Sequence, residues 1–286
     1  MNDLHLKLGL VLESLGMPLR SALFEAAKMS VQGVQLDAVG LLAPENLGDT
    51  ARRDFRTQLR SLNLELTALH CPLRKGLDSF EFQEQRLDHV TKAMQLAYDL
   101  GAKKLILPMP KIPVEVAPAE ETDDAPKPHL FFSGPPPKSA TLRETLTELG
   151  HRGDRMGTWL GLDGGLDSGT TFKEYLATFR SGTLGANFDP ANYLMNGFDP
   201  LASLSGLSDS IKHVHARDGQ RTSASAGSVE VPVGAGDLDW LSVVATLESV
   251  EYRGFLCIER TAGDDRLGDV KASVAFLRRF VPLTRT

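Results

Sequence analysis

Apolar positions along the chain follow two alternating periods. Short apolar runs, typical of buried parallel strands, are followed by stretches in which apolar residues recur at helical spacing. The clearest helical stretch covers residues 80–100, where Leu87, Val90 and Met94 fall on one face and Gly101 supplies a stop. A similar apolar stripe runs through residues 266–281. We therefore expect strands and helices to alternate along the whole chain.

This alternation predicts a barrel of repeated strand-helix units. The expected strands cover residues 6–12, 31–37, 64–70, 104–107, 158–162, 184–188, 211–214 and 255–258. The expected helices cover residues 18–26, 44–62, 80–100, 139–149, 171–179, a short segment opened by the turn at 197–200, 238–247 and 266–281. Parallel strands need crossover helices of this kind, and eight such units that close on themselves form a TIM barrel. We predict an α/β, single-domain (β/α)8 TIM barrel over residues 1–286.

A long stretch at about 108–139 interrupts the periodicity, because it is rich in proline and acidic residues. It could be an interdomain linker, a disordered insertion or a long loop after the fourth strand. The βα order resumes unchanged behind it, which favours a loop on the barrel face that carries active sites. Phe131 and Phe132 would then form a tip that covers the substrate.

Charge and composition exclude several classes of partner. The net charge is −6 and no cluster of Lys and Arg stands out, so we expect no nucleic acid partner. The apolar runs are too short for a membrane span, and the first residues lack the pattern of a signal peptide, so we expect a cytoplasmic protein without a membrane partner. Cys71 and Cys257 lie in apolar runs without disulfide or zinc-finger spacing, which indicates buried thiols in a reducing compartment.

Four expected strands in the second half end in a side chain that can bind a metal. These are Asp163, Asp189, His215 and Glu259. The carboxyl ends of the strands of a barrel open on one face, so one ligand from each unit can reach a single ion. Three carboxylates and one imidazole suit Mn²⁺ or Mg²⁺, with Zn²⁺, Co²⁺ or Fe²⁺ possible.

Each of these residues also has a simpler interpretation. Asp189 precedes Pro190 and could only cap a turn, and Asp163 precedes two glycines and could only form a tight turn. His213 and His215 lie on the same strand, and we expect one imidazole to point into the barrel mouth and the other toward the helices. The position that all four candidates share at strand ends is what favours a metal site.

Four motifs resemble the second half of one known superfamily. They are NFDP at 187–190, HARD at 215–218, GAGDLD at 234–239 and GFLCIE at 254–259. Together they are similar to the xylose isomerase-like TIM-barrel superfamily, which contains sugar phosphate isomerases and epimerases and the AP endonuclease family 2 fold. The first half of the chain is similar only in its βα rhythm.

The resemblance implies one divalent ion at the ends of the fifth to eighth strands. Single-metal members bind it through Glu, Asp, His and Glu, which places Asp163, Asp189, His215 and Glu259 as the ligands. Asp163 stands where the family usually has glutamate. Gln35 stands where the second strand commonly carries glutamate, and epimerases often have a histidine at the position of Asn192.

The resemblance further implies an isomerase or epimerase that acts on a sugar, sugar phosphate or polyol. The reaction would proceed by proton abstraction next to a metal-bound carbonyl, with Glu259 as the base and Asp163 as a weaker catalytic partner. Substrate oxygens would be bound by Arg217, His70, Lys7 and Asn192. Arg217 and Arg260 could instead only pair with Asp218 and nearby acids. Members of this group commonly form homodimers.

Two other functions stay open at this point. A non-catalytic barrel that binds a carbohydrate or a partner protein is suggested by the replacements at Asp163 and Gln35. An endonuclease IV-like DNA-repair enzyme would need three zinc ions and additional histidines. The stretch SASAGSVEVPVG after the seventh strand contains no histidine, which argues against the endonuclease.

Overall fold

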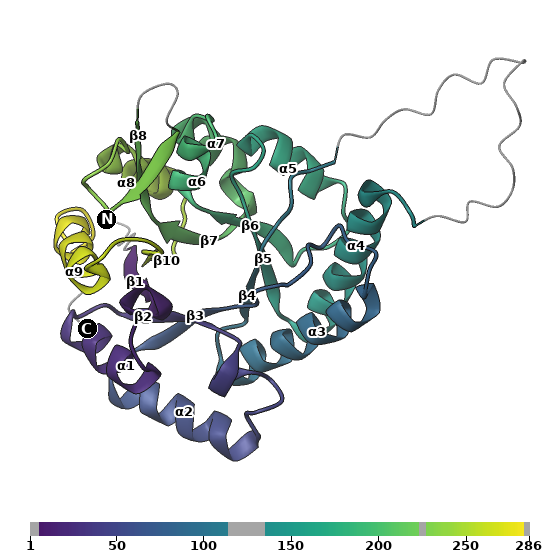
Figure 1. Ribbon diagram of the computed structural model, residues 1–286, viewed down its shortest axis with the longest axis horizontal. Helices are drawn as coiled ribbons and strands as arrows, with labels where there is room; N and C mark the ends of the chain where they lie inside the picture. The colour runs from purple at the N-terminus through teal and green to yellow at the C-terminus, as the bar shows by residue number, and fades with distance from the viewer. Residues whose placement is uncertain (1–5, 114–134, 223–226, 283–286) are drawn as a thin grey trace, which may run out of the picture.

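Eight parallel strands form a closed barrel that helices surround (Figure 1). The computed structural model describes residues 6–113, 135–222 and 227–282. Around the barrel the strands follow the order β1-β10-β7-β6-β5-β4-β3-β2, so the first strand pairs with the last. Their bounds are β1 Lys7–Val11, β2 Gly33–Asp37, β3 Glu65–His70, β4 Lys104–Leu107, β5 Trp159–Asp163, β6 Leu184–Phe188, β7 Ile211–Ala216 and β10 Phe255–Ile258. The predicted single-domain (β/α)8 barrel is confirmed.

The helices cross over between successive strands and cover the outside of the barrel (Figure 1). They are α1 Leu19–Lys28, α2 Asp49–Ser61, α3 Gln83–Leu100, α4 Lys138–Met156, α5 Gly169–Ala177, α6 Pro190–Met195, α7 Pro200–Leu207, α8 Trp240–Ser249 and α9 Arg266–Leu277. The predicted stop of α3 is present, because Gly101 adopts the left-handed conformation that ends many helices. The apolar faces of the helices pack on strands that are buried on both sides.

Two connections between barrel strands differ from the sequence prediction. The crossover between β6 and β7 contains α6 as well as α7, because the side chain of Asp189 caps α6 and Pro190 occupies its first turn. The segment after β7, where no strand was predicted, forms an antiparallel hairpin of β8 Asp218–Arg221 and β9 Ser228–Val231. These strands were missed because each has only four residues and β8, with the sequence DGQR, contains no apolar residue.

The long stretch after β4 leaves the barrel at its carboxyl face. Ile112 donates its backbone N–H to Asp167 Oδ2 at 2.9 Å, which holds the start of this stretch beside the loop after β5. Phe131 and Phe132, predicted to form a substrate-covering tip, lie outside the described residues. Over the described part of the chain, no helix has the length and apolar character to cross a membrane. Both cysteines, Cys71 and Cys257, are free and buried.

Asp218 anchors the hairpin to the barrel and is fully buried. Its Oδ2 accepts hydrogen bonds from Trp240 Nε1 at 2.9 Å and from the Gly234 backbone at 2.9 Å. Gly236 must stay glycine for this contact, since a Cβ there would lie 2.1 Å from Asp218 Oδ1. Asp218 therefore has a structural role, since it fixes the hairpin to the segment that leads into α8.

Replacing Trp240 by phenylalanine is expected to lower the free energy of unfolding by about 2 kcal/mol, because the buried Asp218 carboxylate loses a charge-assisted hydrogen bond. Urea denaturation monitored by circular dichroism measures this change. Trp159→Phe is the control, since Trp159 is exposed. Equal losses in the two variants would contradict the role assigned to the Trp240 indole.

Candidate metal centre

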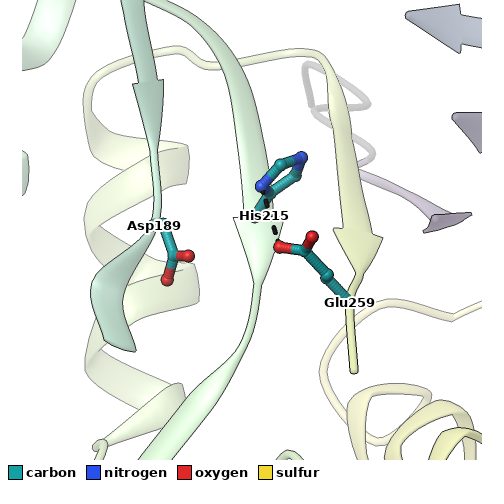
Figure 2. Close-up of side chains that lie close together, drawn as sticks. All are labelled: Asp189, His215 and Glu259. Carbon is teal, nitrogen blue, oxygen red and sulfur yellow. Dashed lines mark ion pairs between the residues drawn. The ribbon is translucent and has the colours of Figure 1, made fainter. Parts of the chain in front are cut away.

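Asp189, His215 and Glu259 come together at the carboxyl ends of three adjacent strands (Figure 2). Asp189 follows β6, His215 is the fifth residue of β7, and Glu259 follows β10. One ligand atom from each lies within 4.8 Å of the others. Among the described residues this is the one group of three or more such side chains placed closely enough to hold an ion. The predicted convergence of these three strand ends is therefore present.

Asp189 is held rigidly by the first turn of α6. Its Oδ1 accepts the backbone N–H groups of Ala191 at 3.0 Å and Asn192 at 3.2 Å. Its side chain is almost fully buried. Asp189 therefore does cap a helix, as the simpler interpretation expected, but the cap uses only Oδ1. Its Oδ2 faces the neighbouring strand and pairs with Arg217 Nη1 at 2.8 Å. One residue both starts the helix and supplies a carboxylate to the site.

His215 is oriented by Gln35 on the opposite side of its ring. Its Nε2 lies 2.9 Å from Gln35 Oε1, and because a carbonyl oxygen only accepts, Nε2 carries the hydrogen. In neutral His215 the lone pair is then on Nδ1, which lies 3.1 Å from Glu259 Oε2 (Figure 2). Two acceptors at this distance repel each other unless a cation lies between them. A proton or a metal ion satisfies this arrangement.

The charges of His215 and Glu259 reflect this pairing. Burial lowers the pKa of His215, but Glu259, with help from Asp163 and Asp189, outweighs this effect, so the net pKa is raised above the ordinary value of 6.5. Burial alone would raise the pKa of Glu259, but His215 and Arg217 lower it to about 2. Glu259 is therefore ionised at neutral pH, and the pair shares a proton that a divalent ion can replace.

Arg217 spans two of the three candidate ligands. Its Nη1 donates to Asp189 Oδ2 at 2.8 Å, and its Nε lies 3.6 Å from Glu259 Oε2. Its Nη2 donates to Glu230 Oε2 at 2.7 Å, and Glu230 comes from hairpin strand β9. Burial lowers the pKa of Arg217, but Asp189, Glu259 and Glu230 raise it by more. The net pKa lies above the ordinary value, so the guanidinium stays charged. Arg217 thus neutralises carboxylates that would otherwise repel each other.

The structure places Asp163 beside the three-residue cluster and not in it. Asp163 ends β5, and its Oδ1 accepts a hydrogen bond from Asn187 Nδ2 at 2.7 Å. The aspartate is one methylene shorter than the glutamate usual in the resembling family, which favours this nearer partner over the ion position. Burial raises the pKa of Asp163 above its ordinary value of 3.8, while His215 and His70 oppose that shift.

Asn187 is a site residue that the sequence reading missed. It lies in β6 and is fully buried. Besides Asp163, its Nδ2 approaches His215 Nδ1 at 3.1 Å, and its Oδ1 accepts from His213 Nδ1 at 2.9 Å. The prediction that His213 and His215 point to opposite sides was wrong. Residues two apart on a strand face the same side, and the two rings lie 5.2 Å apart inside the barrel.

The first-half candidates separate into one residue near the site and one far from it. His70 ends β3, and its Nδ1 donates to Asp37 Oδ1 at 2.8 Å. Burial lowers the pKa of His70, but Asp37 outweighs this effect and raises it overall. Lys7 is not brought to the site, because it begins β1, opposite Phe255 at the start of β10, and binds Glu65 at 2.7 Å. The prediction failed because Lys7 stands at the amino end of its strand.

The remaining candidates line the rim of the site. Asn192 Oδ1 accepts from Arg217 Nη1 at 3.1 Å. Arg260 pairs with Glu230 at 2.9 Å and with Asp269 at 2.8 Å. Arg217 and Arg260 therefore do pair with nearby acids, as the simpler interpretation expected, but not with Asp218, which faces Trp240. Glu230, which joins both arginines, was not found from the sequence because it lies in a segment where no strand was predicted.

The fold and the site define the class of this protein. It is a TIM barrel with a carboxylate and histidine cluster, suited to a metal ion, at the carboxyl ends of its strands. A family model described as xylose isomerase-like TIM barrel matches residues 23–280, and the chain belongs to this family. The match includes nearly all of the first half, where no motif of the family was recognised from the sequence. No curated protein was found to match the chain by sequence.

Solved structures share the whole fold at low sequence identity. A xylose isomerase domain protein from Planctomyces limnophilus is 20% identical with a TM-score of 0.79, and the match covers 97% of this chain and 99% of that one. The 3-keto-D-glucoside 4-epimerase from E. coli is 16% identical, with a TM-score of 0.71 and coverage of 96% and 99%. A xylose isomerase-like TIM barrel protein from Mycobacterium smegmatis, in complex with magnesium, is 15% identical, with a TM-score of 0.70 and coverage of 98% and 98%.

Proposed function

We propose that this protein is a divalent-metal-dependent isomerase or epimerase of a sugar, sugar phosphate or polyol. The observation that carries the proposal is the cluster of Asp189, His215 and Glu259, with the Nδ1 lone pair of His215 facing the Glu259 carboxylate at 3.1 Å. Epimerases with the same fold, among them the 3-keto-D-glucoside 4-epimerase, support the substrate class.

The donor set fits a hard divalent cation. Two carboxylates and one imidazole suit Mn²⁺ or Mg²⁺, and Zn²⁺ or Co²⁺ would also be accepted. The magnesium complex of a protein with the same fold is consistent with this choice. When bound, the ion would polarise a substrate carbonyl and make the neighbouring C–H more acidic.

We assign proton transfer to Asp163 and treat Glu259 mainly as a ligand. Glu259, with a pKa of about 2 and a salt bridge to His215, is a weak base. Burial raises the pKa of Asp163, which brings its carboxyl closer to the range useful for accepting and returning a proton. This reverses the order of the two carboxylates expected from the sequence.

The polar groups around the cluster are assigned to the substrate. His70, oriented by Asp37, can donate a hydrogen bond to a substrate oxygen, as can Arg217 and Asn192 at the rim. Arg217 already contacts Asp189, so it would bind the substrate next to the ion position. These groups fix orientation and do not by themselves select one sugar.

Mn²⁺ affinity is expected to rise about tenfold per pH unit below the raised pKa of His215 and to level off above it, because the proton on Nδ1 must leave first. In the metal-free protein that proton stabilises the folded state. This stabilisation is complete below pH 6.5 and is lost as the pH rises through the raised pKa of His215. Calorimetric titrations from about pH 5.5 to 8.5 measure the affinity. His151→Gln, on exposed α4 surface, is the control, and a flat profile would contradict the assignment.

The proposed function is tested with protein purified without chelators. Elemental analysis is expected to find one divalent ion per chain. Incubation with a panel of ketoses and ketose phosphates in D₂O, followed by NMR, is expected to show metal-dependent exchange of the C–H next to the carbonyl. The absence of a bound ion, together with the absence of metal-dependent exchange in every sugar of the panel, would refute the proposal.

A non-catalytic, carbohydrate-binding barrel is the second candidate. Its specific support is the position of Asp163 outside the cluster, together with Gln35 at a position where a carboxylate is usual. Calorimetric binding of a sugar without C–H exchange would favour it. An endonuclease IV-like function has less support, because the described residues hold one three-residue metal cluster and that enzyme needs three zinc ions.

A further inference from the structure

We propose that Asn187 is a positioning residue that keeps Asp163 away from the metal ion and reserves its carboxylate for proton transfer. The inference rests on the proposed function and adds a residue to it. Asn187 contacts neither the ion position through its own oxygen nor the rim of the site. It acts through Asp163 and His215, both of which its amide nitrogen approaches.

The orientation of the Asn187 amide is set by its partners. An ionised Asp163 only accepts, so the group at 2.7 Å from Asp163 Oδ1 must be the NH₂. The opposite side, Oδ1, then accepts from His213 Nδ1 at 2.9 Å. The second N–H of the amide points to His215 Nδ1 at 3.1 Å. Each polar atom of this fully buried side chain is therefore used, and the amide cannot turn without losing a bond.

The strand register explains why Asn187 reaches Asp163. Asp163 and Asn187 are direct partners in the pairing of β5 with β6, so their side chains lie next to each other. A glutamate in place of Asp163 would extend one methylene further, past this neighbour. The short side chain and the adjacent amide together hold the carboxylate outside the group formed by Asp189, His215 and Glu259.

Removal of the Asn187 amide is expected to strengthen metal binding and to weaken catalysis. Asp163 becomes free to turn toward the cation. Nδ1 of His215 loses a competing donor, while the contact of His215 Nε2 to Gln35 remains. Both changes favour the ion, since Nδ1 can bind it only when the lone pair holds neither a proton nor the amide N–H. The proton carrier is lost in the same step, because a carboxylate bound to the metal is a poorer base. Simple damage to the site would instead weaken binding and turnover together.

The test compares Mn²⁺ titrations and crystal structures of the Mn²⁺ complexes of the wild type and Asn187→Ala. We expect the variant to bind Mn²⁺ about tenfold more tightly, with Asp163 as an added ligand absent from the wild-type complex. Sugar C–H exchange is expected to fall. Asn196→Ala is the control for affinity, since this exposed amide at the end of α6 donates to the Asn192 backbone oxygen and contacts neither Asp163 nor His215. Weaker Mn²⁺ binding by Asn187→Ala overturns the inference.

A second variant keeps the test decisive if Asn187→Ala does not fold. Asp163→Asn is expected to hold Mn²⁺ within about tenfold of the wild type, since it removes a charge but no ligand. Asp189→Asn, which removes a ligand, is expected to lose more than about a hundredfold. Equal losses in the two variants, or Asp163 bound to Mn²⁺ in the wild-type crystal, would overturn this inference but not the proposed function. A wild type that binds no divalent ion overturns the proposed function as well.

Discussion

Glu259→Gln is expected to reduce turnover by at least about a thousandfold and Mn²⁺ affinity by at least about a hundredfold. Glutamine has the same shape, but its amide is uncharged and is a weak ligand. The loss removes the charge that raises the pKa of His215 and the oxygen that lies 3.1 Å from His215 Nδ1. The amide NH₂ can donate to Nδ1 in place of the metal, so the fold should remain intact while the site loses its ion.

Calorimetric Mn²⁺ titration and C–H exchange measure these two effects separately. Asp269→Asn serves as the matched control, because Asp269 pairs with Arg260 at 2.8 Å, next to Glu259 in sequence, and contacts none of the three cluster residues. We expect this control to retain the affinity of the wild type. A Glu259→Gln protein that still binds Mn²⁺ tightly would exclude Glu259 as a ligand, and retained exchange would exclude the metal mechanism.

The barrel and the convergence of three of the four candidate ligands could be predicted from the sequence because they depend on local rules. An apolar run predicts a buried strand, and the first polar residue after it lies at the carboxyl face of a parallel barrel. This rule places Asp189 after β6 and Glu259 after β10. It fails for Lys7, which precedes its apolar run and therefore lies at the other end of the barrel.

The remaining features depend on pairing between distant segments. Asn187 is important because β5 and β6 place it opposite Asp163, and a strand pattern shows only that it is internal. Gln35 orients His215 across 180 residues of sequence. Glu230 reaches Arg217 only because β8 and β9 form a hairpin, which two segments of four residues each did not indicate. Such contacts are set by register and packing, so the sequence of a single chain does not reveal them.

Arg217→Met is expected to destabilise the metal-free protein by about 3–5 kcal/mol, because a buried ion-pair network loses its cation. Asp189 and Glu230 each lose a salt bridge to the guanidinium, at 2.8 Å and 2.7 Å, and Glu259 loses a nearby positive charge. Methionine keeps most of the apolar volume of the arginine stem but cannot neutralise the carboxylates. Urea denaturation in the presence of a chelator measures the loss.

Mn²⁺ is expected to restore much of this stability, since the ion supplies positive charge to Asp189 and Glu259 and no longer competes with the guanidinium for them. The gain in unfolding free energy at saturating Mn²⁺ should therefore be larger in Arg217→Met than in the wild type. Arg260→Met is the matched control, because Arg260 pairs with Glu230 and Asp269 but with neither proposed ligand. It should be destabilised without an enlarged Mn²⁺ gain. Equal gains in both variants would mean that Arg217 and the metal do not share the same carboxylates, and the metal centre would have to lie elsewhere.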